Sequence, residues 1–377
     1  MIKRKRNLMA MSALVLLSAC ASPSTMAPKV TDPELLAEQR KQQLMALEQR
    51  VKEEREFLNI AYPILKKNAS LCPDKKYSAG IDVWSSHTVG KDLADVAAEA
   101  YGVGESLSIS YVFPRSPAAK AGLKAGDILV SMNGTVIPEG QKQLFTYNEQ
   151  NKVLWSSTDF VVLRDGQEKT ITTQNDQICG YNLVYNANDS VVNAYADGEN
   201  IVVTRGMKRF TQTDAELALV VSHELAHNVM DHLDKMKQNA TGGYVAGTVL
   251  DIALAVGGIS TGGFFGKVGS GAGASMYGSD FEAEADYVGM YILANAGYDT
   301  SNAADFWRRM AAENSSKSIK LETTHPTSAE RFLAMGKTHE EIVLKKSKGE
   351  SLEPNIDPDA YNPAKDVYRR EPNSMND

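Results

Sequence analysis

The stretch His223-Glu224-Leu225-Ala226-His227 decides the fold class of the C-terminal half of this sequence. The surrounding residues 213–236 repeat apolar side chains at helical spacing, which predicts that the stretch lies on a helix. On a helix, His223 and His227 lie one turn apart on the same face, so both imidazole rings can bind one metal ion. Glu224 then points beside the ion, where it can take a proton from water. The pattern predicts a zinc-dependent hydrolase.

A catalytic zinc site needs a third protein ligand. The metzincin spacing would place a histidine six residues after His227, but that position is Leu233. His232 is one residue too early, and on a continuous helix it would face away from the pair. We therefore interpret His232 as a surface or structural residue rather than a ligand.

The later segment 280–296 is predicted to be a helix and offers an acidic ligand instead. Glu282 and Asp286 lie one turn apart on one of its faces, so Glu282 is the predicted third ligand. Asp286 would accept a hydrogen bond from a ligand histidine and fix its tautomer. Glu284 is a rival ligand, although two helical steps turn it by about 160° from the face of Glu282.

This combination resembles the gluzincin peptidase family that includes HtpX, the type I CaaX prenyl protease and the mitochondrial Oma-type proteases. The resemblance covers roughly residues 180–335 and is closest to the periplasmic lipoprotein members. It implies one Zn²⁺ per chain and assigns roles to His325, which precedes a proline, and to Arg331. His325 would either stabilise the oxyanion or occupy the open metal position as a brake. Arg331 would support the ligands from outside.

Residues 77–175 resemble a PDZ domain of the bacterial protease type, most specifically in the run from Val112 to Gly134. Such domains hold the C-terminal carboxylate of a peptide on backbone N–H groups and pair the peptide with an open strand. Gly80-Ile81-Asp82-Val83 matches the carboxylate loop. Tyr101-Gly102-Val103-Gly104 is a rival for it. The alternative is that this insert binds no peptide.

The N-terminus predicts export. Residues 1–19 combine a basic start with a short apolar run, and Leu17-Ser18-Ala19-Cys20 resembles the lipobox of bacterial lipoproteins. Cys20 would then carry lipid and anchor the chain to a membrane facing the periplasm. By the same resemblance, Ala21 after it implies sorting to the outer membrane. The two remaining cysteines, Cys72 and Cys179, predict a disulfide that closes the neck of the PDZ-like insert, with two free thiols as the alternative.

The predicted fold class is α+β, with a mainly helical zincin-type metallopeptidase domain, a small β-hairpin from residues 182–185 and 201–204, and the inserted PDZ-like β-rich domain. A buried helix and a Gly-rich loop are expected within residues 241–278. The predicted domains follow in chain order: signal peptide 1–19, tether 20–33, N-terminal helical segment 34–76 (with its helix ending or kinking at Pro63), PDZ-like domain 77–175, zinc metallopeptidase domain 176–340 and polar tail 341–377.

The predicted function is a zinc metalloendopeptidase of the bacterial cell envelope that acts on misfolded or misassembled proteins. The net charge of −7 and the absence of a basic stripe argue against nucleic acid as a partner. A lipid-anchored PDZ binding module or chaperone with a latent metal site is the alternative. Hydrolysis of a substrate other than a peptide also stays open, because the metal motif alone does not select the scissile bond.

Overall fold

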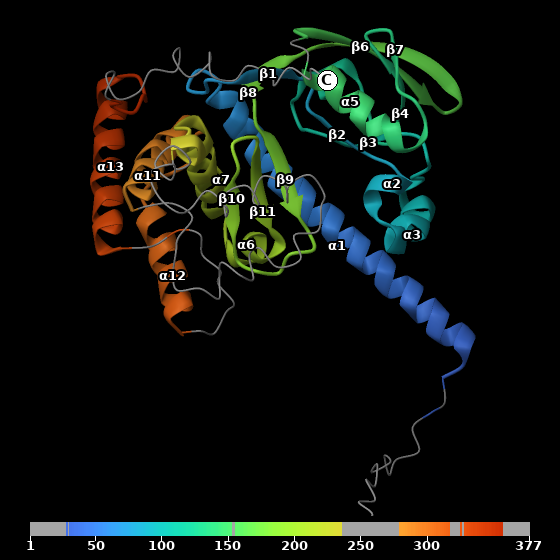
Figure 1. Ribbon diagram of the computed structural model, residues 1–377, viewed down its shortest axis with the longest axis horizontal. Coiled ribbons are helices and arrows are strands. Elements are labelled where there is room, and N and C mark those ends of the chain that lie inside the picture. The colour runs from blue at the N-terminus through green and yellow to red at the C-terminus, as the bar shows by residue number, and fades with distance from the viewer. Residues whose placement is uncertain are drawn as a thin grey trace, which may run out of the picture. The chain divides into compact units, whose positions relative to one another are not determined.

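The structure is a computed structural model that describes residues 28, 30–152, 155–235, 279–316, 325 and 328–356. It combines helices with β-strands, which confirms the predicted α+β class (Figure 1). The predicted signal segment 1–19, the lipidation site Cys20 and the Gly-rich stretch 241–278 lie outside the described residues, as do most of the tether and of the tail. Within the described ranges, no helix is both long enough and apolar enough to cross a membrane.

Helix α1 spans Asp32–Lys67. The contacts within the chain divide it into two units, residues 1–42 and 43–377. In the first unit, the backbone N–H and the hydroxyl of Thr31 both donate to the carboxylate of Glu34, each at 2.8 Å. The expectation that the helix ends at Pro63 is wrong, because it continues for another turn. In this last part the helix buries a continuous apolar face, which outweighs the cost of a proline inside a helix.

The PDZ-like region forms one antiparallel sheet with strand order β2-β3-β4-β6-β7, and β5 pairs with β4. A tight hairpin joins β6 to β7, since Arg164 lies opposite Gln167 and the two turn residues between them adopt positive φ. The elements in chain order are β2 (Ile81–Trp84), α2 (Ser86–Val89), α3 (Lys91–Tyr101), β3 (Ser108–Val112), α4 (Pro117–Ala121), β4 (Ile128–Met132), β5 (Thr135–Val136), η1 (Gly140–Lys142), α5 (Gln143–Lys152), β6 (Ser157–Arg164) and β7 (Gln167–Gln174).

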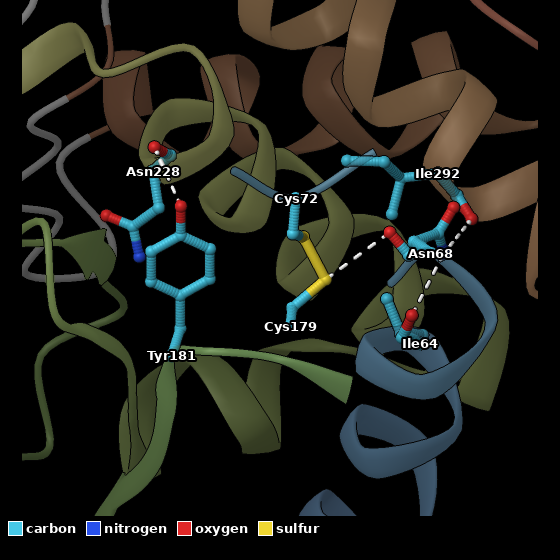
Figure 2. Close-up of a disulfide and its surroundings, with 7 residues drawn as sticks. All are labelled: Ile64, Asn68, Cys72, Cys179, Tyr181, Asn228 and Ile292. Carbon is cyan, nitrogen blue, oxygen red and sulfur yellow. Dashed lines mark hydrogen bonds between the residues drawn. A yellow bond between two sulfur atoms is a disulfide. The ribbon is translucent and has the colours of Figure 1, made fainter. Parts of the chain in front are cut away.

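The chain enters and leaves the PDZ-like region through a two-stranded neck. Strand β1 (Lys75–Ser78) pairs antiparallel with β8 (Asp176–Cys179), and the disulfide Cys72–Cys179 closes the neck, as the sequence analysis predicted (Figure 2). The cysteines are 107 residues apart, so in the chain-entropy model the cross-link stabilises the folded state by about 4–5 kcal/mol. The PDZ-like region is therefore tied at both ends to the same point of the peptidase part.

A small three-stranded sheet follows, with strand order β10-β11-β9. It consists of β9 (Asn182–Asn186), β10 (Ala194–Ala196) and β11 (Asn200–Thr204). The predicted hairpin between the first and last of these is wrong, because β9 and β11 run parallel. The antiparallel partner of β11 is the short β10, which the sequence pattern did not reveal, and the tight turn between them uses Gly198 at φ 91°.

Helices complete the C-terminal part: α6 (Arg205–Phe210), α7 (Asp214–Val229), α11 (Ser279–Asn295), α12 (Ala303–Ser316) and α13 (Ala329–Lys348). Helix α11 packs against α7 on one side and α13 on another. The tail expected from residue 341 is corrected in its first part, since α13 continues to Lys348 and Ile342 is fully buried. The sequence of this segment did not predict the packing, because most of its residues are polar or charged and only about one residue per turn faces the core.

Candidate active site

Helix α7 carries the metal-binding motif on its last turns. Thr213 begins the helix by accepting a hydrogen bond from the N–H of Glu216 at 3.2 Å. The rings of His223 and His227 then lie on the same face, with their Nε2 atoms 3.1 Å apart. Both side chains are buried, at 1% exposure. The spacing of four residues thus brings two ring nitrogens to one point, as a helix requires.

Helix α11 supplies the facing acid. It can approach α7 closely because residue 289 is a glycine, and a Cβ there would lie only 3.1 Å from the Cα of His223. Glu282 is fully buried, and its carboxylate oxygens lie 3.5 Å from Nε2 of His223 and 3.4 Å from Nε2 of His227. The two helices therefore place N, N and O atoms around one buried volume.

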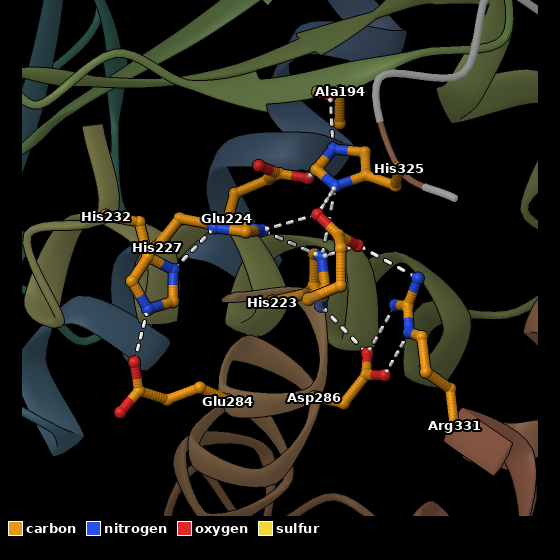
Figure 3. A network of polar contacts seen from close by, with 10 residues as sticks. Ala194, His223, Glu224, His227, His232, Glu284, Asp286, His325 and Arg331 are labelled. Atoms are coloured by element: carbon orange, nitrogen blue, oxygen red, sulfur yellow. Dashed lines mark hydrogen bonds and ion pairs between the residues drawn. The ribbon is translucent and has the colours of Figure 1, made fainter. Parts of the chain in front are cut away.

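His325 joins this group from a segment far along the chain. Its Nδ1 lies 2.7 Å from Glu282 and 3.4 Å from Nε2 of His223. Its Nε2 lies 3.3 Å from Glu224 and 3.3 Å from the carbonyl of Ala194 on β10. Figure 3 shows His325 between Ala194 and the other side chains. One ligand atom from each of four residues falls within 4.8 Å of the others: His223, His227, Glu282 and His325.

A salt bridge supports the ligands from outside. Nδ1 of His223 lies 3.1 Å from Asp286, and Arg331 binds both carboxylate oxygens of Asp286, at 2.6 and 2.8 Å (Figure 3). A third guanidinium nitrogen, Nη1, lies 2.9 Å from Glu282. Arg331 thus fixes two acids at once, and Asp286 is positioned to hold the orientation of the His223 ring.

Of the two interpretations of His232, surface or structural, the structure agrees with the structural one, but the expectation that it faces away from the pair is wrong. It is fully buried, and its Nδ1 lies 2.8 Å from Nδ1 of His227. Its Nε2 lies 2.7 Å from Glu284, so the rival ligand of the sequence analysis contacts His232. The continuous helix predicted over residues 213–236 is wrong, because α7 ends at Val229 and Asp231 adopts φ 54°. This turn redirects the chain, so helical spacing no longer predicts where His232 points.

Burial and neighbouring charges act in opposite directions on the pKa values of the clustered residues. Burial disfavours a charged His223, yet Asp286 and Glu282 raise its pKa above the ordinary value. Burial also opposes charge on His325, but Glu282 and Glu224 raise its pKa well above the usual range. Burial holds the pKa of His227 well below that range. Burial disfavours an ionised Glu282 as well, yet the charge of His325 and hydrogen bonds from the histidines lower its pKa strongly. An ionised acid among ring nitrogens is the charge pattern that favours a divalent cation.

Glu224 lies beside this cluster and is buried at 1% exposure. Its Oε2 has no hydrogen-bond partner among the described residues. A buried carboxylate oxygen without a partner is costly unless a water, ion or substrate group completes it. The set of two histidines and an acid, with a glutamate left to act on a bound molecule, fits the ligand preference of zinc.

The predicted peptide-binding residues begin two residues after the neck strand β1 and continue into β2 of the PDZ-like sheet. Gly80 adopts φ 77°, and a Cβ there would lie 2.4 Å from the side chain of Ser116. Ile81, Asp82 and Val83 belong to β2, an edge strand of the sheet. An edge strand can accept a further strand, as the assignment requires.

The rival carboxylate loop forms the C-terminal cap of helix α3. The N–H of Gly102, at φ 68°, bonds to the carbonyl groups of Ala97 and Ala98, and Val103 is buried. Capping the helix therefore explains the conformation of the Tyr101–Gly104 stretch, and no bound peptide is needed to explain it.

Two regions of the chain are similar to known protein families. Residues 166–339 match the family described as Peptidase family M48, and residues 108–144 match the family described as PDZ domain. A putative beta-barrel assembly-enhancing protease of Vibrio cholerae is 32% identical over 175 residues, which are 41% of this chain and 36% of that protein. The beta-barrel assembly-enhancing protease of Yersinia pestis is 28% identical over 153 residues, 38% of this chain and 31% of that protein.

The matched segments thus span only about a third of these two relatives. Among solved structures, the HtrA-type protease AlgW with a decapeptide matches 27% of this chain and 30% of its own, at 24% identity and a TM-score of 0.22. The first family match covers the segment with the paired histidines, and the second covers the part of the PDZ-like region from β3 to the start of α5. The chain therefore combines a domain of peptidase family M48 with a PDZ domain.

Proposed function

We propose that this protein is a zinc-dependent metalloendopeptidase of the bacterial cell envelope, which hydrolyses peptide bonds in misfolded or misassembled proteins. The observation that carries the proposal is the convergence of His223, His227 and Glu282 on one buried point beside Glu224. The family match and the names of the relatives support it.

In this proposal, His223, His227 and Glu282 hold one zinc ion, which would polarise the scissile carbonyl and acidify a water molecule. The unpartnered oxygen of Glu224 accepts the proton of the attacking water and later returns it to the leaving amine. Asp286 holds the His223 ring, and Arg331 holds Asp286 in place. Burial keeps bulk water from these groups, which strengthens each electrostatic contact.

His325 has two possible roles, and its position favours one of them. Because it contacts Glu282 and lies within the ligand group, it would occupy the fourth position in this arrangement and act as a brake on hydrolysis. Moving it away would open that position to substrate. His325 also contacts the carbonyl of Ala194, which lies on the edge strand β10. An extended substrate could bind to this carbonyl.

The envelope location and the substrates belong to the same proposal. Cys20 would be lipidated and anchor the chain to the outer membrane, facing the periplasm. The disulfide Cys72–Cys179 supports an oxidising compartment. The PDZ domain, through Gly80–Val83 and β2, would capture exposed ends of substrate chains. Replacing Cys20 with Ser should release the protein from the membrane fraction, whereas an unchanged distribution would contradict the anchor.

The decisive test measures zinc content and cleavage on the same preparations. The wild-type protein should contain one zinc per chain by elemental analysis and should degrade casein in a reaction that a chelator stops. The Glu224→Gln variant should keep its zinc and lose cleavage by about 100-fold or more, because general acid–base catalysis contributes that much. Full activity in this variant would refute the mechanism. Bound zinc without any cleavage by the wild type would favour the alternative, a binding module with a latent site.

A further inference from the structure

The two metal-facing histidines are supported from outside in different ways. Nδ1 of His223 faces the carboxylate of Asp286 directly, at 3.1 Å. Nδ1 of His227 instead faces a second histidine, His232, at 2.8 Å. His232 in turn faces Glu284 at 2.7 Å, and Figure 3 shows this chain of contacts leading away from the cluster. A histidine is thus inserted between a metal-facing ring and its acid.

The tautomers of this chain follow from which nitrogen faces the cluster. Nε2 of His227 lies 3.1 Å from Nε2 of His223 and 3.4 Å from Glu282, so a metal ion would bind to Nε2. The proton of a neutral His227 must then sit on Nδ1, which donates to Nδ1 of His232. The proton of His232 is left on Nε2, which donates to Glu284. Each contact is consistent with a single tautomer for both rings.

The surroundings hold His232 in this orientation. The ring of Phe281 stacks on it, with centroids 4.8 Å apart and planes inclined by 28°. Glu284 is 38% exposed at its side chain, and Nζ of Lys235 lies 3.9 Å from it. Because Glu282 and Glu284 lie on different sides of α11, one helix serves both the ligand cluster and this outer chain.

We propose that His232 and Glu284 act as positioning residues for the metal ligand His227, by fixing its tautomer and its ring orientation. The inference rests on the proposed metal site and adds two residues to it. Partners of this kind change metal affinity by about 10- to 100-fold when they are removed. His232 is expected to matter because its loss removes the ring nitrogen that lies 2.8 Å from Nδ1 of the buried His227.

The test is the zinc dissociation constant, measured by competition with a chromogenic chelator, together with the melting temperature of the zinc-free protein. His232→Leu should weaken zinc binding by about 10-fold or more. His232→Asn places an amide oxygen near the position of Nδ1, so it should restore the affinity to within about threefold of the wild type. Glu284→Ala should weaken binding in the same direction, and its partly exposed side chain makes misfolding less of a concern.

The matched control is His339→Leu. His339 also makes one short side-chain contact, to Thr300 at 2.7 Å, but it lies outside the ligand cluster. This variant should bind zinc as the wild type does.

Two outcomes would overturn the inference. In the first, His232→Leu and Glu284→Ala bind zinc as tightly as the wild type. In the second, His232→Asn binds as weakly as His232→Leu, with a parallel fall in the melting temperature of the zinc-free protein, which would indicate a packing role alone. Zinc in the wild type and loss of cleavage in Glu224→Gln are measured separately, so the proposed function would survive either result.

Discussion

Fully and partly buried carboxylates behave in opposite ways in two regions of this molecule. In the ligand cluster, neighbouring histidines lower the pKa of Glu282 strongly although it is fully buried. Where α1 faces the PDZ-like sheet, burial and, to a smaller extent, the nearby Asp82 raise the pKa of Glu54 to about 7. Burial raises the pKa of Asp82 as well. The difference shows that the partners of a buried acid, more than its depth, decide its charge.

The partners differ in a specific way. Glu282 has Arg331 at 2.9 Å and His325 at 2.7 Å, both aimed at its oxygens. Near Glu54, the guanidinium groups are used elsewhere: Arg55 donates to the carbonyl of Ser110 at 3.0 Å, and Arg50 donates to the carbonyl of Val89 at 3.2 Å. These arginines hold the helix against the PDZ-like region through backbone carbonyl groups. Their positive charges lower the pKa of Glu54 only through space, and the effect of burial, which raises this pKa, is larger.

The largest effect is expected from removing the ionised acid of the cluster. Glu282→Gln keeps the shape of the side chain but removes the negative charge that would face the metal. Zinc affinity should fall by more than about 100-fold, beyond the loss typical of an outer partner. Isothermal titration of the zinc-free protein with zinc measures this. Glu340→Gln, at an exposed position of α13, is the control, and an equal affinity in the two variants would remove Glu282 from the ligand set.

The second-largest effect is expected from removing the arginine that pairs with the buried Asp286. Arg331→Met leaves Asp286 buried at 5% exposure without its bidentate partner. Breaking one side of a buried ion pair costs about 3–5 kcal/mol, so the free energy of unfolding should fall by about that much. Chemical denaturation measures it. Arg308→Met removes an exposed ion pair with Asp305 and should cost less than about 1 kcal/mol. Similar losses in both variants would contradict the comparison.

The smallest effect is expected from replacing Glu54, the acid whose charge no direct partner neutralises. The pKa of Glu54 is raised in the folded state above its ordinary value of 4.5, so the folded state binds its proton more tightly and stability falls as pH rises from about 4.5 through about 7. Glu54→Gln should therefore stabilise the protein by roughly 1–3 kcal/mol at pH 8 and have little effect at pH 4.

Urea denaturation at the two pH values measures this difference. Glu48→Gln, at an exposed position on the same helix, should change stability by less than about 0.5 kcal/mol at either pH. A stabilisation by Glu54→Gln that is equal at both pH values would show that its cause is not ionisation.

Local patterns predicted much of the fold correctly. The helix around His223 and His227 and the helix of Glu282 both follow from the spacing of their side chains. These features depend on residues close in sequence. The pairing of β9 with β11 did not follow, because both strands look alike to a local pattern whether they run parallel or antiparallel.

The sequence by itself determined which residue types could form the site: two histidines one turn apart, a glutamate between them and an acid on a later helix. Only the tertiary structure decided what surrounds them. The family resemblance implied roles for His325 and Arg331, but only the structure gives their contacts: His325 joins the group across 98 residues from His227, and Arg331 binds two acids. The tertiary structure also turned His232 back onto His227 through a single residue at positive φ. Helical periodicity predicts direction only while the helix continues, and contacts between distant segments depend on how whole elements pack.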